Sequence, residues 1–334
     1  MNWKAVLCGA AVAVALGSGT SAAVAETKLK YATSAPVKTP WVAHANQVAA
    51  AVQEATGGSV KIDVFPGSQL GNEQDVIRQV ARGRVQMGAF SNTAASLIVP
   101  EISLLAAPYI WDNVAQADCA LDNHMDAVFQ DRFKEMDLVF LGWTEVGQMG
   151  YASAKPIESL TELSGKKVRV APSKTSSLTA ESVGANSVML PITEVASALQ
   201  TGLVDSADLP GLAFTSLGIG KIAPHWIATN HSHQVGVVLM SRKVWSKLTP
   251  EEQTQMQAAR VDPTILRKQV RGAEKMMFGK FEEAGGRIVH PEGEELDRWK
   301  QAGEQARLAL VKELGDKGAA VYEQIQQAKR ACSS

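Results

Sequence analysis

Hydrophobic and polar positions in the first half of the chain follow two alternating periods. Residues 28–33, 60–65 and 85–90 are short runs rich in β-forming side chains, which predicts three strands. Between them, residues 40–56 and 72–83 carry apolar side chains at a spacing of three or four positions and end at glycine, which predicts two helices.

The second half of the chain repeats this order of elements. Strands are predicted at residues 136–145, 166–172, 187–191, 203–210, 231–241 and 287–290. Helices are predicted at 159–165, 193–202, 249–285 and 292–330, and Asp262-Pro263 should interrupt the third of them.

Strands that alternate with helices predict an α/β fold with mostly parallel sheets. Ligands of such sheets bind beyond the carboxyl ends of the strands, which here are the loops after residues 33, 65, 90 and 145. The chain has 334 residues, enough for two cores, and it has no Gly/Ser-rich linker. We therefore expect two lobes that are joined by several crossings of the chain.

Residues 1–25 have the organisation of a cleaved signal peptide. A positively charged start (Met1–Lys4) precedes an apolar run at 5–17, and Ala23-Val24-Ala25 is a small-x-small cleavage site. The alternative is a transmembrane anchor, but the run is shorter than the ~20 apolar residues that span a bilayer. We expect cleavage after Ala25 and a periplasmic protein that does not itself span the membrane.

Export to an oxidising compartment would allow the cysteines of the mature chain to form a disulfide. Cys119 and Cys332 remain after removal of the signal peptide, and in an oxidising compartment they could form a disulfide. The alternative is two free thiols. The sequence does not supply the Cα–Cα distance that decides between them.

Composition and motifs narrow the function classes. The formal net charge is −1, which gives no general electrostatic attraction to nucleic acid. The mature chain has no nucleophile elbow, phosphate-binding loop or H-E-x-x-H motif, so we expect neither catalysis nor a cofactor. His231 and His233 could face the same side of a strand and bind zinc, but no third ligand is near in sequence. We favour structural and pocket roles for these histidines.

Arg169 is the most informative charged residue. It lies in "VRV", near the carboxyl end of a predicted strand, and Val168 and Val170 should face the opposite side. A guanidinium there could bind a carboxylate through two parallel hydrogen bonds. It could equally be a solvated neighbour of Lys166 and Lys167, and spacing alone leaves both readings open.

Four segments together resemble the solute-binding receptors of tripartite ATP-independent periplasmic (TRAP) transporters. They are residues 54–87, with the turn "PGSQLG", and residues 155–170, 191–210 and 229–241. The resemblance implies a two-lobed α/β periplasmic binding protein with a cleft between the lobes and a long hinge-spanning helix. It also implies that Arg169, the arginine of G-x-K-x-R-V, pairs with the carboxylate of a small organic acid that is delivered to membrane subunits.

The resemblance also implies an approximate division of the chain. Residues 26–147 and 230–262 would form the N-terminal lobe. Residues 148–229 would form the second lobe, together with part of 263–334, which also supplies the spanning and C-terminal helices.

Two departures from the family pattern concern the ligand. Met149 stands where related receptors often carry a second arginine, and Leu209, after Asp208, stands where they often carry asparagine. Both changes remove polar contacts, so we expect a monocarboxylate with an apolar or aromatic body. The further candidate site residues are Trp41, Phe90, Trp143, Ser91, Asn92, Gln148 and His233.

Binding would need no chemistry, since closure of the lobes around the ligand would report occupancy to the membrane subunits. The same fold could instead serve a signalling sensor. A secreted metal-dependent enzyme that uses His231 and His233 is the least favoured reading. Whether the protein is a monomer or a dimer stays open.

Overall fold

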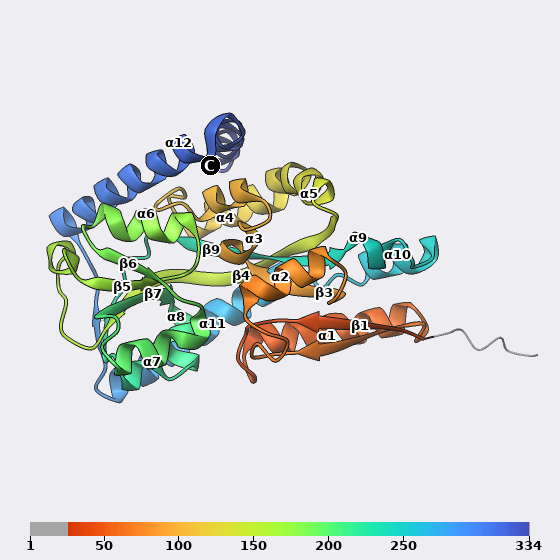
Figure 1. Cartoon of the computed structure of the whole chain (residues 1–334), viewed down its shortest axis with the longest axis horizontal. Helices are drawn as coiled ribbons and strands as arrows, with labels where there is room; N and C mark the ends of the chain where they lie inside the picture. Colours follow the sequence, from red (N-terminus) through yellow and green to blue (C-terminus); the bar gives the residue numbers. More distant parts are fainter. Residues whose placement is uncertain (1–25, 334) are drawn as a thin grey trace, which may run out of the picture.

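The structure is a computed structural model, and it describes residues 26–333 (Figure 1). The expected signal peptide, residues 1–25, lies outside the described residues. Within residues 26–333, no helix combines the length and the apolar composition needed to cross a membrane.

The fold is α/β with two lobes, as the sequence predicts, and each lobe is built on its own part of one mixed sheet. The strand order is β2-β1-β3-β9-β4-β7-β5-β6, with β8 and β10 attached beside β4. In the first lobe β1 pairs in parallel with β2 and β3, and β9 lies antiparallel between β3 and β4. In the second lobe β5 pairs in parallel with β6 and β7.

The strands have the following bounds. They are β1 (Thr27–Ala32), β2 (Val60–Phe65), β3 (Met87–Ser91), β4 (Leu138–Ser153), β5 (Lys167–Val170), β6 (Asn186–Met189), β7 (Ser206–Pro210), β8 (His225–Ile227), β9 (His233–Ser241) and β10 (Arg287–Val289).

One strand joins the two lobes. The predicted end of the strand at residue 145 is wrong, because β4 continues to Ser153 and pairs with β9 in the first lobe and β7 in the second. Its register shifts near Gly142 and Gly147, both at positive φ, where glycine costs no steric strain. The two glycines interrupt the alternation that would have predicted one long strand. They also allow β4 to bend between the lobes.

Helices pack against the sheet of each lobe. Those of the first lobe are α1 (Pro40–Ala55), α2 (Glu73–Ala81), α3 (Asn92–Ala95), η1 (Pro100–Ala106), α4 (Val114–Ala120), η2 (Leu121–Met125), α5 (Asp126–Glu135), α9 (Arg242–Trp245) and α10 (Pro250–Ala258). Those of the second lobe are η3 (Leu160–Leu163), α6 (Lys174–Ser182), η4 (Ile192–Glu194), α7 (Val195–Gln200), α8 (Gly211–Ser216) and η5 (Ile219–Lys221). The sequence pattern predicts none of α4, η2, α5, α6 and α8.

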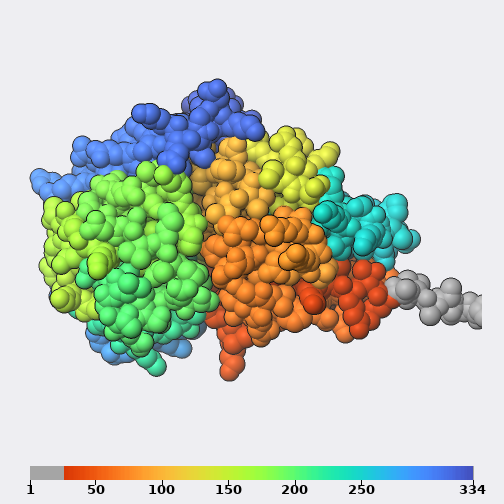
Figure 2. Space-filling model, viewed as in Figure 1, coloured from red at the N-terminus to blue at the C-terminus, as the bar shows by residue number. Residues whose placement is uncertain are grey.

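Two long helices connect the lobes. As expected, Asp262-Pro263 separates α10 from α11 (Pro263–Glu283), which contacts α1 on one side and α8 on the other. The C-terminal helix α12 (Gly293–Ala331) kinks at Gly315. Trp299 in its first part packs into the second-lobe core, and Val321 in its last part packs into the first-lobe core. Figure 2 shows α12, in blue, running over both lobes.

The two cysteines form a disulfide, which resolves the alternative that the sequence leaves open. The Cα atoms of Cys119 and Cys332 are 5.9 Å apart, within the range that a disulfide requires. The bond ties the end of α12 to α4 in the first lobe.

Candidate ligand-binding cleft

Arg169 is a buried side chain at the carboxyl end of β5. Its flanking residues Val168 and Val170 belong to the second-lobe core, as the alternation of the strand predicts. Only 2% of Arg169 is exposed, and it is held by two backbone acceptors. Nε donates to the carbonyl of Leu190 at 2.9 Å and Nη1 donates to the carbonyl of Asp208 at 2.8 Å. Among the described residues Nη2 has no hydrogen-bond partner, so it remains available to a ligand.

The guanidinium of Arg169 has no carboxylate hydrogen-bonded to it among the described residues, and Asp208 is the nearby carboxyl. Burial lowers its pKa to about 10, and the nearby Asp208 carboxyl partly opposes this effect. Burial also raises the pKa of Asp208 to about 7, although Arg169 lowers it. A buried guanidinium that lacks a full counter-charge favours an anionic ligand.

Arg169 lines a cavity of about 120 Å³ between the lobes. Its walls come from both lobes and comprise Ser34, Ala35, Pro36, Trp41, Ser68, Asn72, Glu73, Gln74, Ser91, Thr93, Val146, Met149, Arg169, Ala171, Pro191, Ile192, Thr193, Pro210, Ala213, Leu217 and Gln234.

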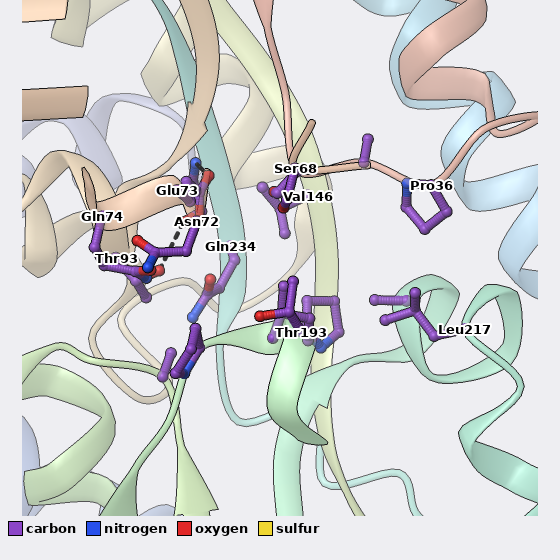
Figure 3. Close-up of a pocket in the computed structure, with 18 of the residues that line it drawn as sticks. Pro36, Ser68, Asn72, Glu73, Gln74, Thr93, Val146, Thr193, Leu217 and Gln234 are labelled. Atoms are coloured by element: carbon purple, nitrogen blue, oxygen red, sulfur yellow. Dashed lines mark hydrogen bonds between the residues drawn. The ribbon is translucent and has the colours of Figure 1, made fainter. Parts of the chain in front are cut away.

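The walls of this cleft are unequal in polarity. Figure 3 shows Asn72, Glu73, Gln74 and Thr93 gathered at one side of the cavity, with Gln234 beside them. Pro36 and Leu217 lie together on the other side. A sugar ring has hydroxyl groups around its edge and C–H groups on its faces, so a cleft with one polar and one apolar wall matches it. The apolar wall is compatible with the apolar ligand body expected from the sequence, and the polar wall adds hydrogen-bonding groups that the sequence analysis did not anticipate.

Glu73 is a site residue that the sequence analysis missed. It is the first residue of α2, directly after the N-cap Asn72. Its carboxylate accepts hydrogen bonds from the backbone N–H of Ser91 at 2.5 Å and from the Ser91 hydroxyl at 2.8 Å. Burial raises the pKa of Glu73, while the two bonds from Ser91 lower it. The position of Glu73 at a helix start after the "PGSQLG" turn could have suggested it.

Four of the predicted site residues line this cleft: Trp41, Ser91, Met149 and Arg169. Trp41 also crosses the cleft floor, since its indole N–H donates to the carbonyl of Glu145 at 2.6 Å.

The other predicted site residues point elsewhere. Leu209 packs into the second-lobe core, and the carboxylate of Asp208 lies 3.5 Å from His231 on the far face of β7. Asn92 is buried in α3 and lies outside the cleft wall, whereas the neighbouring Thr93 lines the cavity. Phe90 belongs to the first-lobe core.

The three remaining candidates lie in the first lobe and at the hinge. Trp143 packs against Phe129 and Phe140 in the first-lobe core and donates its indole N–H to Asp126 at 2.5 Å. Gln148 and His233 contact each other at 3.5 Å on paired positions of β4 and β9. Strand alternation therefore places Gln234, and not His233, in the cleft.

A partly buried ionic network joins α11 to residues of the first lobe and β4. Arg271 of α11 donates to both oxygens of Asp118, each at 2.7 Å, and to Glu145 at 3.0 Å. One turn earlier, Arg267 binds Asp122 through two bonds of 2.6 and 2.8 Å. The network attaches α11 to the first lobe.

The histidines do not join into one metal-binding group in the described part of the chain. His233 has atoms close to Asp118 and Glu145, a set that could hold a metal ion, but Arg271 already neutralises both carboxylates. His231 is separate, with Nδ1 bonded to Thr229 at 2.7 Å. Burial lowers the pKa of His231 to about 3 and of His233 to about 4, so both imidazoles are neutral at pH 7.

Glu274 of α11 links the hinge helix to α8 and should make stability depend on pH. It accepts a hydrogen bond from the N–H of Leu212 at 3.2 Å, and burial, with the nearby Glu145, raises its pKa to about 7. The folded state then binds more protons than the unfolded state between pH 4.5 and about 7, so stability falls as the pH rises through this window. Above about pH 7, the free energy of unfolding of Glu274→Gln should be about 1–3 kcal/mol higher than that of wild type, because glutamine carries no buried charge.

Urea unfolding at pH 5 and pH 8 measures this difference, which should be large only at pH 8. Glu282→Gln, which removes an exposed carboxylate from the same helix, is the control. An equal effect of Glu274→Gln at both pH values would contradict the assignment.

Comparison with known proteins identifies the family. Residues 31–313 match the model of the bacterial extracellular solute-binding proteins, family 7 (DctP). The uncharacterized protein YiiZ of Salmonella typhimurium is 31% identical over 62% of this chain and 64% of its own length. The 2,3-diketo-L-gulonate-binding periplasmic protein YiaO of Escherichia coli is 25% identical over 79% of this chain and 80% of its own.

A solved structure shows the same arrangement of lobes. A TRAP periplasmic solute-binding protein from a Bradyrhizobium species, in complex with galacturonate, is 26% identical. It superposes with a TM-score of 0.84 over 90% of this chain and 99% of the other. The chain therefore belongs to family 7 of the bacterial extracellular solute-binding proteins, the TRAP receptor family that its sequence motifs resemble.

Proposed function

We propose that this protein is the periplasmic receptor of a TRAP transporter and that its ligand is a sugar acid with one carboxylate. The observation that carries the proposal is the buried, backbone-fixed guanidinium of Arg169 in a cleft whose opposite wall is polar. Arg169 would bind the carboxylate. The wall that contains Asn72, Glu73 and Gln74 would bind the hydroxyl groups.

The relatives support this ligand class. YiaO is named for 2,3-diketo-L-gulonate, and the Bradyrhizobium receptor was solved with galacturonate, both of which are sugar acids. Because residue 149 is methionine and not arginine, Arg169 is the one positively charged side chain among the residues that line the cleft. One positive charge fits a ligand with a single carboxylate.

Delivery would follow the binding step. We propose that residues 1–25 direct export and are removed after Ala25. Residues 26–147 and 230–262 would then act as one lobe and 148–229 as the other, with helices from 263–334 spanning them. Closure around the ligand would exclude water from Arg169 and present a changed surface to the transporter membrane subunits.

A ligand screen by thermal shift and calorimetry tests the proposal. Because a ligand that binds only the folded state raises Tm, D-galacturonate, D-galactonate or 2,3-diketo-L-gulonate should raise it, whereas succinate and benzoate should not. Succinate lacks the hydroxyl groups, and benzoate presents an apolar ring to the polar wall. A strong response to succinate or benzoate, with none to the sugar acids, would overturn the proposal.

A further inference from the structure

We infer that Glu73 makes the receptor reject sugar acids that carry a second carboxylate. The inference rests on the proposed function, since it assumes that Arg169 binds the first carboxylate. The receptor would then accept uronates and aldonates, which have one carboxylate, and exclude aldarates, the sugar diacids of the same carbon chain.

The charges on the cleft wall carry the first step. Among its lining residues one side chain is positive, Arg169, and one is negative, Glu73. They come from different lobes, because Arg169 lies on β5 and Glu73 begins α2. A ligand that fills the cleft therefore meets a cation at one lobe and an anion at the other.

The hydrogen bonds of Glu73 carry the second step. Its two bonds from Ser91 fix the carboxylate in place and partly offset burial, which raises the pKa of Glu73. An ionised carboxylate only accepts hydrogen bonds, so its remaining lone pairs can accept a hydrogen bond from a ligand hydroxyl. A second ligand carboxylate has no proton to donate at neutral pH.

Repulsion carries the third step. Two like charges that are close together in a partly dehydrated cleft repel strongly, and the neutral Met149 offers no compensation. The neighbouring side chains Asn72, Gln74 and Thr93 are uncharged, so they do not neutralise a second carboxylate. We expect the aldarate to bind at least about a hundredfold more weakly than the matching monocarboxylate.

Calorimetry at pH 7.5 with three six-carbon acids tests the inference. D-galacturonate and D-galactonate have one carboxylate, whereas galactarate has a second in place of the terminal hydroxymethyl group of galactonate. Wild type should bind the tighter monocarboxylate at least about a hundredfold better than galactarate. Glu73→Gln should bring this ratio below about tenfold, mainly by strengthening galactarate binding, because glutamine still accepts hydrogen bonds but carries no charge.

Glu54→Gln provides the matched control, since Glu54 is an exposed carboxylate of the same lobe, on α1, and lies outside the cleft wall. It should leave the ratio unchanged. If wild type binds galactarate as well as the monocarboxylates, or if Glu73→Gln keeps the full ratio, the inference is overturned while the proposed function stands. If none of the three acids binds and 2,3-diketo-L-gulonate does not bind either, the proposed function fails, and the inference fails with it.

Discussion

Arg169→Ala should lower the affinity for the carboxylate ligand by roughly a hundredfold or more. The guanidinium is held by the carbonyls of Leu190 and Asp208, so it pays little entropy to meet the ligand. The ligand carboxylate would lose a charge-assisted bond in a buried site, which is worth more than the ~0–1 kcal/mol of an exposed ion pair. Isothermal titration calorimetry of the variant measures the loss directly.

Two further variants separate the roles of charge, geometry and folding. Lys166→Ala removes an exposed charge near the start of the same strand and should leave the affinity unchanged. Arg169→Lys keeps the charge but loses the fork that binds a carboxylate twice, so it should fall between wild type and Arg169→Ala. Wild-type affinity in a folded Arg169→Ala protein would show that the carboxylate binds elsewhere.

Removal of the disulfide should have the largest effect on stability. Cys119 and Cys332 are 213 positions apart, so the bond restricts a long loop of the unfolded chain. Cys119→Ala/Cys332→Ala should therefore lower the free energy of unfolding by about 2–5 kcal/mol. Denaturant unfolding under oxidising conditions measures the difference.

Reduced wild-type protein is the control for this variant. Wild type unfolded in the presence of a reductant should match the double variant, because both lack the same covalent restraint. Ligand affinity should stay close to wild type, since neither cysteine lines the cleft. Equal stability of oxidised and reduced wild type would contradict the expected contribution of the bond.

The amino-acid sequence by itself determined the elements with a strong period. The first three strands and the first two helices lie within a few residues of their predicted bounds, because their apolar side chains recur at the strand or helix spacing. The interruption at Pro263 follows from the restricted backbone before proline. The family motif selected Arg169, for which strand alternation alone left two readings.

Tertiary structure alone decided which neighbours of the predicted site residues face the ligand. The bulges of β4 at Gly142 and Gly147 change the direction of the side chains that follow, and the sequence does not reveal their position. On β9, alternation places Gln234 and His233 on opposite faces, and only the packing of the lobes decides that the face with Gln234 lines the cleft.

The sequence also could not predict which residues face Arg169 across the cleft. Glu73 is almost a hundred positions before Arg169 and lies in another lobe, so only the packing of the two lobes brings both to one cavity. The sequence thus selected Arg169 as the residue that we propose binds the carboxylate. The folded chain determined the rest of the ligand-binding surface, because that surface is made of side chains from loops and strand ends of both lobes.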